Sequence, residues 1–199
     1  MTRLGISIGM AALFMACSSA ASGTGVNSSS AEKASEAIPI AKLTNAPRRV
    51  SAMARLNSPL KQVWRYLGVH QNLLEYSNGV LGKVTIDTTG AQGENGVGTK
   101  RQCETSDGSG KFVERIVYYK APYAFAYSAV ENTWGLQDHL ATVTLKPDGD
   151  GTIVQWDQYF NHVKPEMTPM MAENIEGMLK GKILSYLTGK FGGEVLGSR

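Results

Sequence analysis

The chain has 199 residues, of which 42% are hydrophobic, and its formal net charge is +3. No basic stripe runs along it, so the near-balanced charge argues against a nucleic-acid-binding protein. Motifs for metal or acyl-transfer chemistry (HExxH, CxxC, GxSxG) are absent, and His70, His139 and His162 are scattered. No cofactor and no metal are therefore predicted.

Residues 1–16 are predicted to be a secretory signal peptide. Arg3 gives a positive start, and an apolar run follows from Gly5 to Ala16. The run is too short to span a bilayer comfortably. A buried N-terminal helix is the structural alternative, but the charge, the run and the small residues after it favour export. Removing this segment lowers the net charge from +3 to +2, because Arg3 is its only charged side chain.

Two cleavage sites compete at the end of this segment. The residues before Cys17 resemble a bacterial lipobox, in which the cysteine is lipidated and becomes the mature N-terminus. Ordinary cleavage near Ala20 or Ala21 is the alternative. Residues 17–45 are rich in Ser and Ala and predict a flexible tether. Because a tether is useful when its far end is anchored, lipidation at Cys17 is favoured, with the membrane as a partner through that anchor.

The predicted location is the periplasmic side of the cell envelope. Ser18, which follows Cys17, resembles the sorting signal of outer-membrane lipoproteins, and a soluble periplasmic or secreted protein is the alternative. If Cys17 is lipidated, Cys103 is left alone, so no internal disulfide is expected even in an oxidising compartment.

Residues 46–199 have the length of one domain. Hydrophobic periodicity and turn residues divide this domain into short segments of period two and longer segments of helical period. The predicted elements are a strand over 48–57, a helix opened by Ser58 and Pro59 and ended by Gly68, a shorter helix around 73–76, strands over 81–89, 98–105, 110–119, 123–132, 139–147 and 152–163, and a long helix from about 168 to 190.

The segment GTKRQCETSDGSGKFVERI predicts a β-hairpin. Asp107-Gly108 is a favoured type I′ turn, because glycine tolerates the positive φ that this turn requires. With that turn, Arg101 pairs with Glu114 on the same face as Cys103 and its partner Phe112. A mostly apolar, inward face is thus predicted to hold an ion pair.

Gly177 and Gly181 form a GxxxG motif in the long C-terminal helix. Lys180 and Lys182 rule out a membrane helix, so the motif is not a transmembrane dimerisation signal. We expect the glycines to let the helix approach the sheet or to leave room between them.

The order of one strand, two short helices, six antiparallel strands and a long helix, with GVGTKR, DG, VERI and GTIVQW, resembles the polyketide cyclase/START-like (SRPBCC) superfamily, which includes birch-pollen-allergen-like proteins. The resemblance covers about residues 50–190. It implies an α+β helix-grip fold, in which a seven-stranded antiparallel sheet wraps around the C-terminal helix. It also implies a cavity between sheet and helix for lipids, sterols, polyketides or other hydrophobic molecules.

Strand parity and this resemblance together nominate the ligand-binding side chains. Arg101 and Glu114 would form a polar hook in an apolar pocket, or would merely tie the hairpin together. The full set of nominated residues is Arg101, Glu114, Tyr127, His139, Trp156, Gln158, Ile175, Met178 and Leu179.

Three functions are compatible with this site. The favoured one is an exported, non-enzymatic protein that binds or carries a hydrophobic small molecule. The second is a cyclase or dehydratase in which Glu114 and His139 act as acid and base. The third is an envelope protein that makes protein contacts and whose interior is filled by its own side chains.

Overall fold

The computed structural model describes residues 37–197. The predicted signal peptide, the lipidation site Cys17 and most of the predicted tether lie outside these residues. The strands are β1 (Arg48–Leu56), β2 (Leu81–Asp87), β3 (Lys100–Thr105), β4 (Lys111–Lys120), β5 (Ala124–Asn132), β6 (Leu136–Asp148), β7 (Gly151–His162) and β8 (Gly193–Leu196). The helical segments are α2 (Ile40–Leu43), α3 (Leu60–Leu67), η1 (His70–Asn72), α4 (Leu73–Tyr76), η2 (Pro165–Met167), α5 (Thr168–Met178), η3 (Leu179–Leu184) and α6 (Ser185–Phe191).

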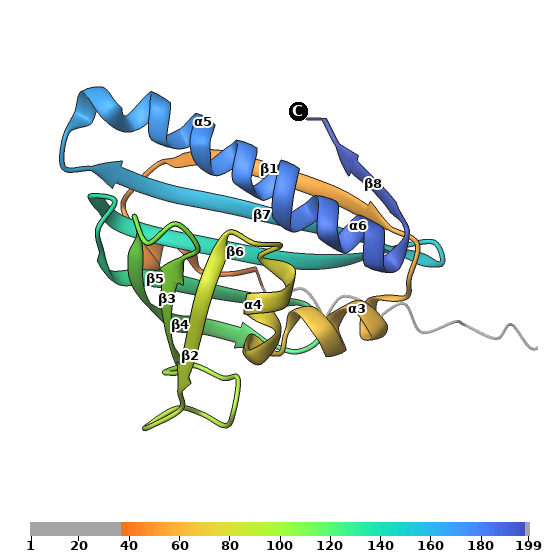
Figure 1. The fold of residues 1–199 in the computed structure, drawn as a ribbon. Coiled ribbons are helices and arrows are strands. Elements are labelled where there is room, and N and C mark those ends of the chain that lie inside the picture. Colours follow the sequence, from red (N-terminus) through yellow and green to blue (C-terminus); the bar gives the residue numbers. More distant parts are fainter. Residues whose placement is uncertain (1–36, 198–199) are drawn as a thin grey trace, which may run out of the picture. The chain divides into compact units, whose positions relative to one another are not determined.

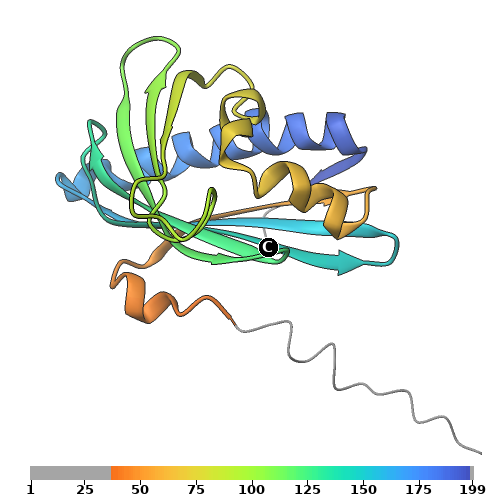
Figure 2. The same ribbon diagram turned by 90° about the horizontal axis from the view of Figure 1, so that it is seen from below.

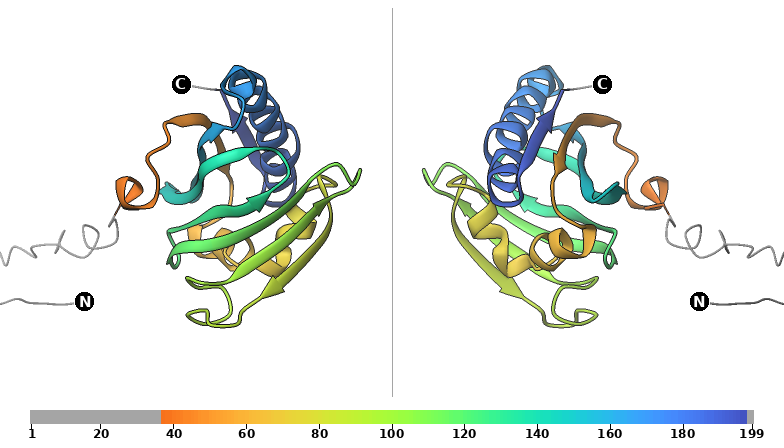
Figure 3. Two further views of the ribbon diagram at one scale, coloured as in Figure 1. Left: turned by 90° about the vertical axis from the view of Figure 1, so that its left-hand side faces the viewer. Right: turned by 90° about the vertical axis from the view of Figure 1, so that its right-hand side faces the viewer.

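All strand pairs are antiparallel, and the sheet has the order β2-β3-β4-β5-β6-β7-β1-β8. The continuous helix α5–η3–α6 crosses one face of the sheet, and the sheet curves around it (Figures 1 and 3). The short helices α3 and α4 lie on the same side, where they close the space beside the long helix (Figure 2). The predicted helix-grip fold is confirmed.

The described residues form eight strands, one more than predicted. The additional strand β8 follows α6 and pairs with β1, so that Gly193 lies opposite Leu56. Gly193 has a φ of +119°, and a Cβ there would lie 2.0 Å from the carbonyl oxygen of Arg55. Only glycine fits this approach. A four-residue strand that begins with glycine carries too little periodicity to be recognised in the sequence.

The core lies between the sheet and the helix and follows the side-chain alternation of the strands. On β1, Val50, Ala52, Ala54 and Leu56 are all buried. The buried residues Ala141, Val143 and Leu145 on β6 and Val154, Trp156 and Phe160 on β7 continue the same face, and Ile175, Leu179, Ile183, Leu184 and Leu187 of the helix pack onto it.

A second apolar cluster surrounds Leu140 and Tyr159 and is separate from the main core. Three residues of the segment before β1, Ile38, Ile40 and Leu43, pack against this cluster. Residues 37–45 were assigned to the tether by composition, but apolar side chains among them find partners on the domain. The tether boundary at residue 45 is thus placed too late.

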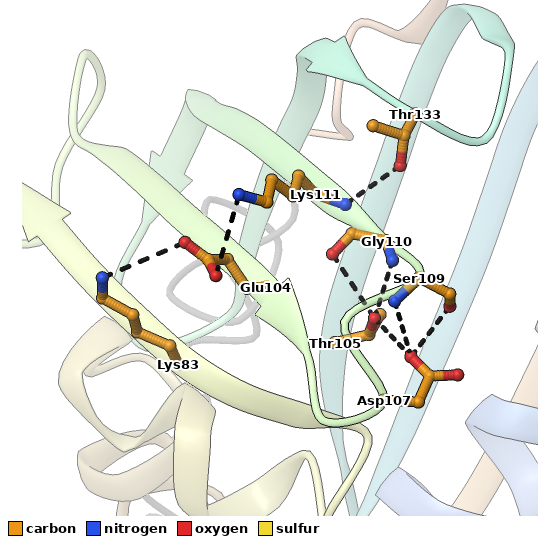
Figure 4. A network of polar contacts seen from close by, with 8 residues as sticks. All are labelled: Lys83, Glu104, Thr105, Asp107, Ser109, Gly110, Lys111 and Thr133. Atoms are coloured by element: carbon orange, nitrogen blue, oxygen red, sulfur yellow. Dashed lines mark hydrogen bonds and ion pairs between the residues drawn. The ribbon is translucent and has the colours of Figure 1, made fainter.

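The β3–β4 hairpin has the predicted register, with Arg101 opposite Glu114. Its predicted type I′ turn is wrong, because Gly108 has a positive φ of 73° but Asp107 does not. Instead the Asp107 carboxylate accepts hydrogen bonds from the Thr105 hydroxyl and from the amide and hydroxyl of Ser109, at 2.7, 3.0 and 2.8 Å (Figure 4). These bonds lower the pKa of Asp107 to about 2. The longer loop keeps the parity of the strands, which is why the register prediction survives.

Two local predictions about helices are also corrected. Ser58 does not cap α3: its hydroxyl donates to the carbonyl oxygen of Phe191 at 3.3 Å and ties the start of α3 to the end of α6. Gly177 and Gly181 are exposed, and a Cβ added to either would meet nothing within 4 Å. They therefore do not bring the helix close to the sheet. The π-helical segment η3 begins two residues after Gly177 and includes Gly181.

Candidate functional site

A cavity lies between the sheet, α4 and the C-terminal helix, and offers about 80 Å³ to the centres of water-sized molecules. This is room for several water molecules, since one water needs on the order of 10–15 Å³ by this measure. Its walls are mainly apolar. The apolar lining side chains are Leu73, Val80, Leu81, Phe112, Trp134, Leu136, Ile175, Met178 and Ile183.

Seven of the nine nominated ligand-binding residues line this cavity. They are Arg101, Glu114, Tyr127, His139, Gln158, Ile175 and Met178. Trp156 and Leu179 do not: both are fully packed in the core, and the Trp156 indole donates to the Tyr127 hydroxyl at 3.3 Å. Trp156 thus lies behind Tyr127, which lines the cavity. Strand parity alone cannot tell this position from one that faces the cavity directly.

The Arg101–Glu114 ion pair forms part of the cavity wall. Arg101 Nη2 lies 2.7 Å from Glu114 Oε2, and the two side chains are 1% and 15% exposed. The guanidinium carbon also lies 4.1 Å from the centre of the Tyr127 ring, which is a cation–π distance. Burial opposes the charge on Arg101, but Glu114, together with smaller contributions from Tyr76, Tyr127 and Cys103, more than offsets burial and raises the pKa of the guanidinium. The guanidinium thus stays charged, and its contacts with Glu114 and Tyr127 hold it in a fixed geometry.

Cys103 adjoins this pair, with its Sγ 3.9 Å from Glu114 Oε2. Burial, with the neighbouring carboxylate, raises the pKa of the thiol to about 12. A thiol held protonated is a poor nucleophile. Cys103 therefore acts as an unreactive lining residue of the cavity.

Two buried polar residues near Arg101, His70 and Tyr76, do not line the cavity and were not nominated from the sequence. Arg101 Nε and Nη1, the Tyr76 hydroxyl and His70 Nδ1 are buried without hydrogen-bond partners. His70 Nε2 donates to the carbonyl oxygen of Asn95 at 3.0 Å, and its backbone amide donates to the Asn95 side chain at 2.9 Å. Burial, and next the charge on Arg101, lower the pKa of His70 to about 3. His70 is therefore neutral and fastens the glycine-rich loop over 91–98 to the domain.

His139 is held by hydrogen bonds at both ring nitrogens. The backbone amide of Ala129 donates to Nδ1 at 3.0 Å, so the ring proton is on Nε2, which lies 2.9 Å from Gln158 Oε1. Burial lowers the pKa of His139. A neutral imidazole with both nitrogens engaged is not available as the base of an acid–base pair with Glu114.

Several lining residues were not nominated from the sequence. Phe112 was placed on the inner face of the hairpin but was not recognised as a ligand contact. Trp134 comes from the β5–β6 turn, where periodicity gives no direction, and its ring is perpendicular to that of Phe112 at a centroid distance of 4.5 Å. Leu73 and Ser77, from α4 and its end, reach the cavity only because α4 folds back over the sheet.

Two kinds of site are not found within the described part of the chain. No group of three or more His, Cys, Asp and Glu side chains among residues 37–197 is arranged to hold a metal ion. None of the helices in the same range combines the length and the apolar composition needed to cross a bilayer.

A family model described as "Polyketide cyclase / dehydrase and lipid transport" matches residues 47–185, which is more than half of the chain. The chain belongs to this family. A comparison with curated proteins found no match. The family and the fold together indicate a domain of the START-like and birch-pollen-allergen-like type, which binds hydrophobic ligands or acts as a cyclase.

Solved structures support the fold assignment. A protein from Thermobifida fusca is 19% identical with a TM-score of 0.61, over 72% of this chain and 92% of that one. Truncated norcoclaurine synthase from Thalictrum flavum is 16% identical with a TM-score of 0.59, over 74% and 94%. A START superfamily protein from Mycobacterium smegmatis is 14% identical with a TM-score of 0.57, over 71% and 95%. At these identities the likeness concerns the fold alone.

Proposed function

We propose that this protein binds or carries a hydrophobic small molecule in the cavity between its sheet and its C-terminal helix. The observation that carries the proposal is a mainly apolar cavity whose polar lining residues include Glu114 on β4, Tyr127 on β5 and Gln158 on β7. Small-molecule sites typically combine apolar walls with a few fixed polar groups. We also propose a location at the bacterial cell envelope, which the predicted signal peptide and the lipobox-like residues before Cys17 support.

A binding role is favoured over catalysis by the state of the polar groups. His139 uses both ring nitrogens in hydrogen bonds, and Glu114 is paired with Arg101. Neither group is therefore a free acid or base in the arrangement that a cyclase or dehydratase acting through these two residues needs.

An enzymatic role is the second candidate, because a related fold performs chemistry. One solved relative is norcoclaurine synthase in complex with dopamine and hydroxybenzaldehyde, at 16% identity and a TM-score of 0.58. In this chain such chemistry would rest on Glu114 alone. Loss of turnover in Glu114→Gln with ligand affinity retained would favour this candidate.

The binding proposal is tested by titrating the purified protein with N-phenyl-1-naphthylamine, a neutral apolar dye whose fluorescence rises in apolar surroundings. Ala129 lines the cavity, so Ala129→Phe should fill it and weaken binding at least tenfold. Val130, the next residue on β5, is 48% exposed, and Val130→Phe is the matched control. Saturable binding that both variants retain equally would contradict a site in the cavity.

Extraction of the purified protein with organic solvent, followed by mass spectrometry, addresses the natural ligand. We expect a hydrophobic molecule to co-purify in stoichiometric amount with the wild type and to be lost from Ala129→Phe. A circular dichroism spectrum and a melting curve for each variant separate loss of the cavity from loss of the fold.

A further inference from the structure

The Gln158 side chain is oriented by a chain of hydrogen bonds that begins at the backbone of a neighbouring strand. The Ala129 amide can only donate, so it fixes Nδ1 of His139 as an acceptor. His139 Nε2 therefore carries the proton and donates to Gln158 Oε1 at 2.9 Å. This bond assigns the two ends of the amide: its oxygen faces His139, and its NH₂ group is turned away from it.

The Gln158 NH₂ group is left open to the cavity. The residue is 4% exposed and lines the cavity, and its amide nitrogen has no hydrogen-bond partner among the described residues. That nitrogen is also not among the buried atoms sealed off without a partner. It is thus a donor held in a fixed direction in an apolar cavity, where an acceptor on a ligand would satisfy it.

Glu114 offers the complementary group. Its Oε2 atom is occupied by Arg101 at 2.7 Å and adjoins Cys103, whereas Oε1 has no partner among residues 37–197. The side chain lines the cavity and is 15% exposed. An ionised carboxylate is an acceptor only, so this oxygen accepts a hydrogen bond from a ligand hydroxyl or amine.

Arg101 cannot act as a second hook for the ligand. Its Nη2 atom forms the ion pair with Glu114, and its Nε and Nη1 atoms are buried and inaccessible to solvent. A ligand carboxylate would thus meet the charge of Glu114 without access to a free donor of Arg101. Like charges in a site of low dielectric repel strongly.

We propose that the cavity selects a neutral, mainly apolar compound that carries both a carbonyl-type acceptor, bound by the Gln158 amide, and a hydroxyl, bound by Glu114, and that it rejects carboxylates such as fatty acids. This inference rests on the proposed binding function and assigns His139 as a positioning residue that aims Gln158. It makes Gln158, not Arg101, the donor that the ligand contacts.

Four compounds that share the naphthalene ring system test the inference. Their dissociation constants are measured by fluorescence or calorimetric titration at pH 8. They are 6-acetyl-2-naphthol, 2-acetylnaphthalene, 2-naphthol and 2-naphthoic acid. We expect the hydroxy-ketone to bind tightest, each compound lacking one group to bind about 3- to 10-fold more weakly, and the acid to bind weakest.

Variants assign the effects to residues. Gln158→Leu should weaken the two ketones about 3- to 10-fold and leave 2-naphthol unchanged. Glu114→Gln should reverse the rejection of naphthoic acid, because the charge of Arg101 is then uncompensated. His139→Leu should lower affinity for the ketones alone, a selectivity that general unfolding would not produce. Gln102→Leu, on the exposed face of β3, is the matched control.

The outcomes distinguish this inference from the binding proposal. Binding of all four compounds within about threefold of one another, or equal loss for all of them in Gln158→Leu, would overturn the inference while the cavity remained a binding site. Failure of the wild type to bind any of the four, while it binds N-phenyl-1-naphthylamine, would overturn the inference alone, and failure to bind that dye as well would overturn both. The predicted order of affinities, with the selective loss in Gln158→Leu, would establish the amide as the ligand's donor.

Discussion

Removing one partner of the buried ion pair gives the sharpest test of the cavity wall. Arg101→Met leaves the Glu114 carboxylate without its partner at 2.7 Å. Such a loss costs about 3–5 kcal/mol, and the 15% exposure of Glu114 through the cavity favours the lower value of about 3 kcal/mol. For a domain of this size that corresponds to a fall in Tm of about 6–12 °C.

The reciprocal change should cost more. Glu114→Leu strands the Arg101 guanidinium, which is 1% exposed and stays charged, so we expect about 5 kcal/mol. The double variant Arg101→Met/Glu114→Leu removes both charges and fills the space with apolar atoms. Replacement of a whole buried pair is often neutral, so it should lie within about 1–2 kcal/mol of the wild type.

Urea denaturation monitored by tryptophan fluorescence measures these free energies of unfolding. The control is Arg55→Met, which breaks the 2.6 Å pair with Asp148 at a position where both side chains are 44% exposed. It should cost less than about 1 kcal/mol. The reasoning fails if the two single changes at the buried pair simply add in the double variant, or if Arg101→Met costs no more than Arg55→Met.

Three further predictions concern titration, helix stability and thiol reactivity. His70 stays neutral in the folded protein down to a pKa of about 3, whereas the unfolded chain takes up its proton near pH 6.5. Both states are neutral above pH 6.5, so this proton should lower the free energy of unfolding only below that pH, by about 1.4 kcal/mol per pH unit. In urea unfolding from pH 7 to 4, the free energy of unfolding should therefore fall less steeply with decreasing pH in His70→Gln. Gly177→Ala, where the added Cβ meets nothing within 4 Å, should raise the free energy of unfolding by about 0.5–1 kcal/mol. Gly108→Ala, at a φ of +73°, should lower it by about 1 kcal/mol. A higher melting temperature for Gly108→Ala than for Gly177→Ala would contradict the geometry. The Cys103 thiol, with a pKa of about 12, should react with an aromatic disulfide reagent at pH 8 only after unfolding. The reaction of Cys103 is the difference between the wild type and Cys103→Ser. Rapid reaction in the native state would show that the thiol is not buried.

The sequence predicted those features that depend on local periodicity. Alternation along the hairpin strands is a property of neighbouring residues, so Arg101 could be placed opposite Glu114 before any tertiary contact was known. The same holds for the inward faces of β6 and β7 and for the amphipathic C-terminal helix. Even the wrong turn at Asp107-Gly108 left the register intact, because the longer loop encloses an even number of residues.

Features that depend on long-range approach were missed. Strand β8 exists because Gly193 can lie against Arg55, which is distant in sequence. The packing of Ile38, Ile40 and Leu43 onto the domain depends on an apolar cluster assembled from several strands, so composition alone assigned these residues to a tether. Ser58 has the residue type of a helix cap, yet its hydroxyl is taken by Phe191.

The sequence by itself thus determined the family, the order of the elements and the presence of charged side chains on an inward face. Only the tertiary structure decided which of the inward residues reach the cavity and what each atom can do there. Trp156 and Gln158 share one face of β7, but one packs behind Tyr127 and the other turns its amide into the cavity. Parity fixes the side of a sheet on which a residue lies. The hydrogen bonds that fix the tautomer of His139 and the direction of Gln158 come from three different strands, and they form only when those strands are in place.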